Sequence, residues 1–367
     1  MKSPLWLRIA FSLMFLVFKI RYRLVVKGVE KCFKEKKESS FGTLFLPNHP
    51  AIFVDPLMVL GTIYSKTTVR SLAIDYVYDH WTSNWLMKAT GAIRTPYVSI
   101  KSLKDPSVKT EIEEGIQEII SGLKQGENYL IYPSGQCKDS NLEVIAGSST
   151  VYNIVKSCPD VNIVLIRIKG LFGSSFSRYW EGRTPSVGSV LFHSIPYVIK
   201  NFIFFTPKRD VVVEFHEVPI DFPYDAPTRL SFNRYLEDWY NQPDGLTDQE
   251  GVLPGDSTIL LSLSAYGEAY PKKIIGKELE KYIEIPKEVK KKVLNKLVEL
   301  SELDAGSIHS NMHLHYDVGL DSLEVVDLLN YLSSEFSLEI ERISDVQPLT
   351  VGKLIFLASQ HYHSDNL

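Results

Sequence analysis

Five short apolar runs, separated by stretches with helical periodicity, are the feature that most constrains what this chain can fold into. The runs lie between residues 42 and 218. The clearest helical stretch is 108–123, where apolar residues recur at the i, i+3, i+4 and i+7 positions of one helix face. Alternating strands and helices indicate a mostly parallel sheet covered by helices. We therefore predict an α/β domain with strands at Thr43–Leu46, Arg70–Ile74, Asn128–Tyr132, Asn162–Ile168 and Val211–Phe215.

The composition changes after this domain and predicts a second one. The chain of 367 residues is long enough for two domains, and its 11% aromatic and 23% charged residues argue against disorder. Residues 297–367 hold 12 acidic and 2 basic side chains, whereas the net charge of the whole chain is only −4. We predict an N-terminal helix at 1–26, an α/β domain at 27–240, a Gly/Pro/Asp-rich linker at 241–283 and a small all-α bundle of four helices at 284–367.

The N-terminus carries an uncharged apolar run, Ile9–Phe18, between basic residues. Ten residues are too few to span a bilayer, which takes about 20. No small-residue cleavage site follows, so we do not expect a cleaved signal peptide. Two interpretations remain: a helix that lies on an anionic membrane surface, or a core helix with basic ends. We expect peripheral attachment to the cytoplasmic face of a membrane.

A second apolar stretch, residues 190–209, ends in Lys208 and Arg209. It fits either a core helix or an element that faces a membrane or an acyl chain. The cysteines do not point to a metal site, because their spacing is not that of metal ligands. Their odd number suits reduced thiols in a cytosolic setting. These cysteines are Cys32, Cys137 and Cys158.

The stretch "LFLPNHPAIFVDPL" (44–57) holds a histidine and an aspartate in a turn that its three prolines keep from being a helix. Such a turn can bring the Asp55 carboxylate to the His49 ring. The carboxylate would then fix the tautomer, and the other ring nitrogen would accept a proton from a hydroxyl or an amine. The alternative is a histidine that caps the backbone of the turn, with Asp55 beginning the next helix. No metal is expected, because no further ligand lies nearby at suitable spacing.

The segment "PNHPAIFVDP" resembles the first signature block of the glycerolipid acyltransferases, the superfamily that acylates glycerol phosphate and 1-acylglycerol phosphate. The usual block has four residues between the His and the Asp-Pro, and this chain has five. The resemblance covers about residues 20–240. It implies that His49 is the general base and that Asp55 orients it.

The later blocks of that family are present in altered form. "KATGAIRTPY" resembles block two, and "YPSGQCKDS" resembles block three with Ser134 at the Glu position and Cys137 at the Arg position. Arg167 replaces the usual proline of block four. The resemblance implies that the head group of the substrate, with its phosphate, is held by Arg94, Ser134, Gly135 and Lys138.

The stretch "DVGLDSLEVVDLLNYLSSEF" (317–336) opens an amphipathic helix at Ser322. Asp321 and Ser322 are favoured helix N-caps, which is one interpretation. The stretch also closely resembles the acyl carrier protein signature Gly-x-Asp-Ser-Leu, and this resemblance covers about residues 284–362. It implies that Ser322 carries covalent 4′-phosphopantetheine, attached by a phosphopantetheinyl transferase.

Together the two resemblances imply an O-acyltransferase that moves a fatty acyl group from a carrier thioester to a glycerophospholipid-type acceptor, lysophosphatidic acid or a lysophospholipid. The alternatives are an N-acyltransferase of an amino lipid, or an inactive acyltransferase that serves as a membrane-bound carrier scaffold. The expected partners are an acyl thioester donor, the lipid acceptor, a membrane surface and an acyl-activating enzyme supplied in trans. No nucleic-acid partner is expected.

Overall fold

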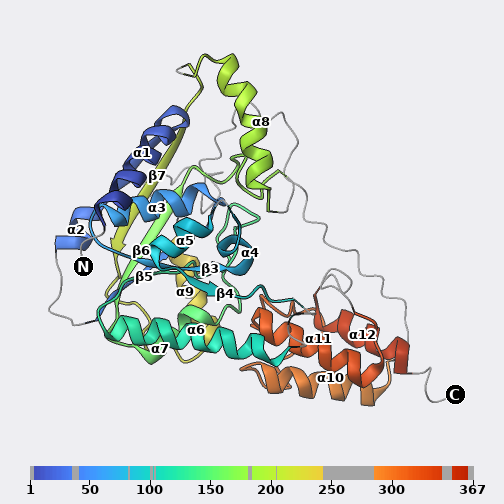
Figure 1. Ribbon diagram of the computed structural model, residues 1–367. Coiled ribbons are helices and arrows are strands. Elements are labelled where there is room, and N and C mark those ends of the chain that lie inside the picture. The colour runs from blue at the N-terminus through green and yellow to red at the C-terminus, as the bar shows by residue number, and fades with distance from the viewer. Residues whose placement is uncertain are drawn as a thin grey trace.

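The computed structural model describes a sheet domain within residues 4–242 and a helical domain within residues 285–362 (Figure 1). The described residues are 4–34, 41–81, 83–99, 102, 105–180, 184–203, 205–242, 285–340 and 349–362. The predicted linker falls almost entirely outside them. The elements are α1 (Leu5–Arg21), β1 (Tyr22–Lys27), α2 (Val29–Lys34), β2 (Thr43–Pro47), α3 (Val54–Tyr64), β3 (Arg70–Ile74), α4 (Asp75–Tyr78), α5 (Asn84–Thr90), β4 (Ile93–Thr95), α6 (Pro106–Lys124), β5 (Tyr129–Leu130), α7 (Thr150–Ser157), β6 (Asn162–Lys169), α8 (Val187–Lys200), β7 (Arg209–Glu217), α9 (Arg229–Asn241), α10 (Lys287–Leu300), α11 (Ser322–Phe336) and α12 (Val351–Tyr362).

A seven-stranded sheet forms the centre of the sheet domain, in the order β1-β7-β6-β2-β5-β3-β4. Neighbouring strands are parallel except β6 and β7, which are antiparallel. The carboxyl ends of the five strands from β6 to β4 therefore meet at one edge of the sheet. In open α/β sheets this is the edge where ligands bind. The predicted fold class, a mostly parallel sheet covered by helices with an all-α domain after it, is confirmed.

Helices cover both faces of this sheet because successive strand residues point to opposite faces. In β2, Leu44 and Leu46 pack into a core with α6, α7 and α9. Phe45, between them, packs into a second core with α1 and α3. The continuous apolar runs of the sequence are thus strands that are buried on both sides. This double cover fixes the end of β2, where the turn with His49 begins.

The helical domain packs α10, α11 and α12 around its own apolar core. Helix α11 begins at Ser322, as predicted, and Asp321 caps it by accepting a hydrogen bond from the Glu324 backbone N–H. Pro286 is the N-cap of α10. A fourth helix is not tested, because residues 341–348 lie outside the described residues.

Two expectations about local structure were wrong. The N-terminal helix ends at Arg21, and the next six residues form β1, which pairs with β7. Strand β4 at Ile93–Thr95 was also missed, and β5 is only Tyr129–Leu130. The local sequence did not reveal β1 because its strand partner is distant along the chain.

Helices α1 and α8 expose apolar side chains. Helix α1 buries Leu7 and Phe11, and its exposed side chains include Trp6, Leu13 and Leu16. The core-helix interpretation of residues 190–209 is wrong for α8, because α8 buries none of its residues. Phe192 of α8 is 72% exposed. Phe202 and Phe205, which follow the end of α8, are 78% and 79% exposed. Within the described residues, no helix is both long and apolar enough to cross a bilayer.

Candidate functional site

The turn after β2 is fastened by the Asn48 side chain and contains one residue with a strained backbone, Phe53. The buried Asn48 side chain donates to the Ile168 carbonyl at 3.1 Å and accepts from the Ile168 N–H at 2.7 Å. This pair of bonds fastens the turn to β6. Phe53, just before α3, has a φ of 62°, which non-glycine residues rarely adopt. Strained backbone of this kind persists where the surrounding structure over-determines it, often at functional sites.

His49 and Asp55 form the predicted contact. The Nδ1 atom of His49 lies 2.9 Å from Oδ2 of Asp55, a carboxylate that is completely buried. The same oxygen accepts the Ala51 backbone N–H at 3.2 Å. The His49 side chain is 14% exposed. Because an ionised carboxylate accepts and does not donate, Nδ1 carries the proton and Nε2 is left as the basic nitrogen.

Burial and charge act on His49 in opposite directions. Burial alone would lower its pKa, but the negative charge of Asp55 and the nearby Cys137 outweigh it, so the pKa of His49 lies well above 6.5. The same causes therefore favour a second proton on the ring. It becomes a base only after losing that proton, so proton acceptance should increase as pH rises.

The basic nitrogen of His49 faces a cysteine. Nε2 lies 3.3 Å from Sγ of Cys137, which is buried. The His49 ring also packs on the Tyr132 ring with 4.1 Å between centroids. Cys137 stands at the arginine position of block three, so its contact with His49 was not predicted. The substitution itself was the sequence signal that could have drawn attention to it.

The loop 132–143 is held together by Glu143, which is 2% exposed. Glu143 accepts the His49 backbone N–H at 3.3 Å and the Ser134 hydroxyl at 2.7 Å. The Gly135 N–H closes a turn onto the Tyr132 carbonyl. Ser134 and Gly135 thus have internal partners, and their predicted role in holding a head group stays a prediction. The role of Glu143 was not predicted, because Glu143 lies 94 residues from His49 along the chain.

The predicted basic ligands also have protein partners. Lys138 is buried, donates to the Asn141 carbonyl at 3.0 Å and lies 4.9 Å from the centroid of the Phe172 ring. Arg94 forms ion pairs with Asp79 at 3.0 Å and Glu111 at 2.7 Å. Strand β4, which carries Arg94, is three strands from β2, so about 14 Å of sheet separates the two. Phosphate binding by these side chains stays a prediction.

Two other basic residues from the sequence have structural roles. Arg209 is buried and donates to the carbonyls of Gly170 and Phe172. Arg167 lies over the Trp239 ring with 4.3 Å to its centroid. Both residues brace the sheet domain.

Ser322 is the first residue of α11 and is exposed. Among the described residues its hydroxyl has no hydrogen-bond partner, because the capping of α11 is done by Asp321 and Glu324. An exposed, unengaged hydroxyl fits a site for covalent attachment of phosphopantetheine. A serine that only capped the helix would use its hydroxyl on the helix backbone.

Comparison with known proteins adds to this geometry. Residues 280–366 match the family model of the C-terminal ACP domain of the highly reducing polyketide synthase sdgA. The helical domain is similar to an acyl carrier domain. We call it the carrier domain from here on. The match covers about a quarter of the chain and leaves the sheet domain outside it.

The sheet domain has a distant structural likeness. The chain is similar to PlsC, the 1-acyl-sn-glycerophosphate (LPA) acyltransferase from Thermotoga maritima, at 18% sequence identity and a TM-score of 0.39. The likeness covers 63% of this chain and 72% of that one. No curated protein matches the chain. Because the TM-score is below 0.5, this likeness supports no conclusion about chemistry, which we argue from the geometry of the site alone.

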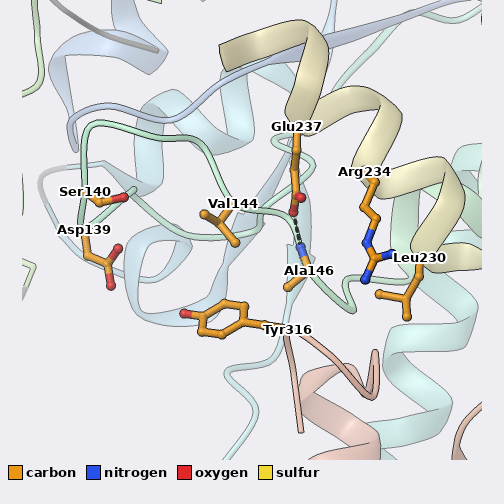
Figure 2. A pocket seen from close by; sticks show the side chains of 8 residues that line it. All are labelled: Asp139, Ser140, Val144, Ala146, Leu230, Arg234, Glu237 and Tyr316. Carbon is orange, nitrogen blue, oxygen red and sulfur yellow. Dashed lines mark hydrogen bonds between the residues drawn. The ribbon is translucent and has the colours of Figure 1, made fainter. Parts of the chain in front are cut away.

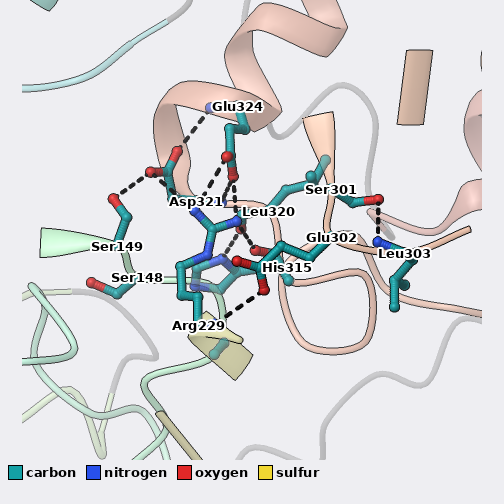
Figure 3. Close-up of polar contacts among 12 residues, drawn as sticks. Ser148, Ser149, Arg229, Ser301, Glu302, Leu303, His315, Leu320, Asp321 and Glu324 are labelled. Atoms are coloured by element: carbon teal, nitrogen blue, oxygen red, sulfur yellow. Dashed lines mark hydrogen bonds and ion pairs between the residues drawn. The ribbon is translucent and has the colours of Figure 1, made fainter. Parts of the chain in front are cut away.

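The carrier domain contacts the sheet domain through Arg229, the first residue of α9 (Figure 3). The Arg229 guanidinium is largely buried. It donates to both carboxylate oxygens of Glu324, at 2.8 and 3.2 Å, and to the Gly319 carbonyl at 2.6 Å. Ser149 donates to Asp321 at 2.6 Å. The contact therefore engages the two acidic residues next to Ser322.

The backbones of the two domains approach closely at two glycines. A Cβ atom on Gly147 would lie 2.4 Å from the Leu320 carbonyl oxygen. A Cβ atom on Gly319 would lie 2.7 Å from the Leu230 side chain. A further ion pair joins Lys109 to Asp327 at 2.5 Å.

A pocket of about 150 Å³ lies beside this contact (Figure 2). Seven residues of the sheet domain and Tyr316 of the carrier domain line it. Asp139 and Ser140, which belong to the loop 132–143, lie on one side of the pocket, and Leu230 and Arg234 of α9 lie on the other (Figure 2). Ala146 lies between them, and its N–H donates to Glu237 at 2.6 Å. The pocket thus lies between the carrier domain and the loop that contacts His49.

Proposed function

We propose that the chain is an acyltransferase that moves a fatty acyl group from a carrier thioester to a glycerophospholipid-type acceptor. The observation that carries this proposal is the oriented His49–Asp55 pair at the carboxyl edge of the sheet, in a chain that brings its own carrier domain. A thioester is an activated acyl donor, so its transfer needs a positioned base rather than a metal.

The proposed work of His49 is to accept the proton of the attacking group. Asp55 holds the ring so that Nε2 points away from the carboxylate, and it stabilises the imidazolium that forms. The low exposure of His49 keeps water from the pair. Such shielding favours transfer to an acceptor over hydrolysis of the donor.

We propose Ser322 as the attachment site of the cofactor. When bound there, 4′-phosphopantetheine supplies the thiol that holds the acyl group as a thioester. Arg229 and Ser149 hold the residues around Ser322 against the sheet domain. This contact supports use of a donor on the same chain. The pocket beside it is lined by Asp139 and Ser140, which belong to the loop that holds Cys137.

We propose peripheral membrane binding as the source of the acceptor. The exposed apolar side chains of α1 and α8 support it. Arg21 at the end of α1 lies 5.8 Å from the Tyr197 ring centroid of α8, so the two surfaces are adjacent. Apolar surfaces with basic flanks bind anionic bilayers through burial and charge together.

The test is a transfer assay with the full chain, phosphopantetheinylated and loaded with one defined acyl group. Lysophosphatidic acid, a lysophospholipid and an amino lipid are offered separately, and the products are identified by mass spectrometry. An acylated glycerolipid supports the proposal. Transfer to the amine alone would replace it with N-acyl transfer, and no acylated product with any acceptor would favour a scaffold. The His49→Ala chain measures the background.

A further inference from the structure

Cys137 completes a row of three groups with His49 and Asp55, and the proposed direct transfer does not use its sulfur. Its Sγ atom lies 3.3 Å from Nε2 of His49, and Nδ1 of the same ring lies 2.9 Å from Asp55. A nucleophile, a base and a group that orients the base are the parts of nucleophilic acyl transfer. A cysteine buried only for packing would need no histidine base at its sulfur. The Cys158 thiol instead donates to the Ile120 carbonyl, and among the described residues neither Cys158 nor Cys32 has a hydrogen bond with a histidine.

A second observation at the same place is independent of the sulfur. The hydroxyl of Tyr132 is buried and has no hydrogen-bond partner among the described residues. Its ring packs on His49. A buried hydroxyl without a partner is costly, so its presence needs an explanation. A hydroxyl that donates to the oxyanion of a tetrahedral intermediate would have a partner only during reaction.

We propose that Cys137 is a catalytic nucleophile and that the acyl group passes through a thioester on its sulfur. This deepens the proposed function and rests on it. In the first step His49 accepts the Cys137 proton, and the sulfur attacks the acyl carbonyl of the thioester donor. The donor's carbon–sulfur bond breaks, and its thiolate takes the proton from His49. One thioester replaces another, so no oxidant or reductant is required.

The second step uses the same base. An acceptor hydroxyl gives its proton to His49 Nε2 and attacks the acyl carbonyl on Cys137. The bond from carbon to Cys137 sulfur breaks, and the sulfur takes the proton back. Tyr132 donates a hydrogen bond to the carbonyl oxygen in both steps. The chain thus accepts the acyl group before the lipid binds, which predicts ping-pong kinetics.

Trapping the acyl group on the enzyme tests the first step. The full chain carrying Ser322→Ala, which has no serine for the arm, is incubated with a decanoyl thioester of N-acetylcysteamine and no acceptor. We expect one decanoyl group on the peptide that contains Cys137, released by neutral hydroxylamine. Each further substitution is made in the Ser322→Ala chain. With Cys137→Ala the decanoyl group should be absent, and with His49→Ala it should form much more slowly. With the matched cysteine control Cys158→Ala it should be retained. The absence of acyl from Cys137 in the parent chain would overturn the proposal.

Transfer kinetics test the second step. In the loaded full chain with Ser322 intact, Cys137→Ala should reduce transfer about a hundredfold or more, because the group that carries the acyl intermediate is lost. If folded Cys137→Ala keeps more than a tenth of the activity while His49→Ala is inactive, transfer is direct. That result would overturn the inference and leave the proposed function standing. If the wild-type chain forms acyl-Cys137 but transfers to no acceptor, the proposed function fails and the nucleophile assignment stands. Circular dichroism of each variant separates loss of chemistry from loss of fold.

Discussion

Replacing Arg229 with alanine should release the carrier domain from the sheet domain. The Arg229 side chain is 10% exposed, and its guanidinium makes three hydrogen bonds across the contact, two of them to the carboxylate of Glu324. The backbone N–H of Arg229, which donates to Glu302 at 3.0 Å, is unaffected by the change. The perturbation therefore removes the side-chain contact and leaves the start of α9 in place.

The size of the effect follows from these bonds. A hydrogen bond to a charged group contributes about 1.5–3 kcal/mol. The Glu324 side chain is 25% exposed and regains water on release, so we take about 2–3 kcal/mol for the whole guanidinium rather than adding the bonds. At 1.4 kcal/mol per tenfold, the ratio of docked to undocked chains should fall roughly 30- to 150-fold. A docked population of roughly 99% would then fall to about 40–75%.

Zero-length carbodiimide cross-linking measures this population. The reagent joins an amine to a carboxylate in contact, and Lys109 lies 2.5 Å from Asp327 across the same interface. We expect a Lys109–Asp327 cross-linked peptide in the wild-type chain and a clearly lower initial yield with Arg229→Ala. Arg234→Ala is the matched control, because it removes an exposed arginine of the same helix that has no ion pair among the described residues. Equal yields from wild type and folded Arg229→Ala would refute the reasoning.

The remaining predictions concern the site, the pH profile, the membrane and the carrier. His49→Ala should lower transfer about 10²- to 10⁴-fold without unfolding the chain, as measured by product formation and thermal melting. Because Asp55 raises the pKa of His49, kcat/KM of the wild type should increase through a pKa above 6.5, and in Asp55→Asn that limb should move to lower pH; an unmoved limb contradicts the assignment. Replacing Phe192 and Phe202 with serine should weaken binding to anionic vesicles by roughly 100-fold or more in sedimentation, since burying each ring contributes about 1.5–3 kcal/mol. Ser322→Ala should abolish the mass gain that a phosphopantetheinyl transferase produces, and a wild-type chain that gains no mass would disprove the attachment site.

The local pattern of apolar and polar residues predicted the bounds of several strands and helices. The strand Arg70–Ile74 has the predicted bounds, and α11 begins at the predicted Ser322. The contact of His49 with Asp55 was predictable because six residues and three prolines confine the two side chains to one turn. Strand β1 was not predictable, since residues 22–27 become a strand by pairing with β7, about 187 residues further along the chain.

The rest of the site depends on contacts that the sequence does not display. Cys137 lies 88 residues from His49 along the chain, and Glu143 lies 94. Only the folding of β2 beside β5 brings the two loops together. The internal pairing of Lys138 was equally hidden, because a lysine in a polar loop is ordinarily exposed. Resemblance named the residues of this loop but could not say which way each side chain points.

The close approach at Gly319 has a consequence for the choice of partner. The Leu230 side chain occupies the place where any other residue would carry its Cβ atom. A side chain here would press on Leu230 and move the Gly319 carbonyl away from Arg229. Glycine also stands at this position in the acyl carrier signature, so the fit admits any carrier that keeps this glycine and gives the attached carrier no advantage in shape. Its advantage comes from attachment, because a domain on the same chain meets the surface around Arg229 at a high effective concentration.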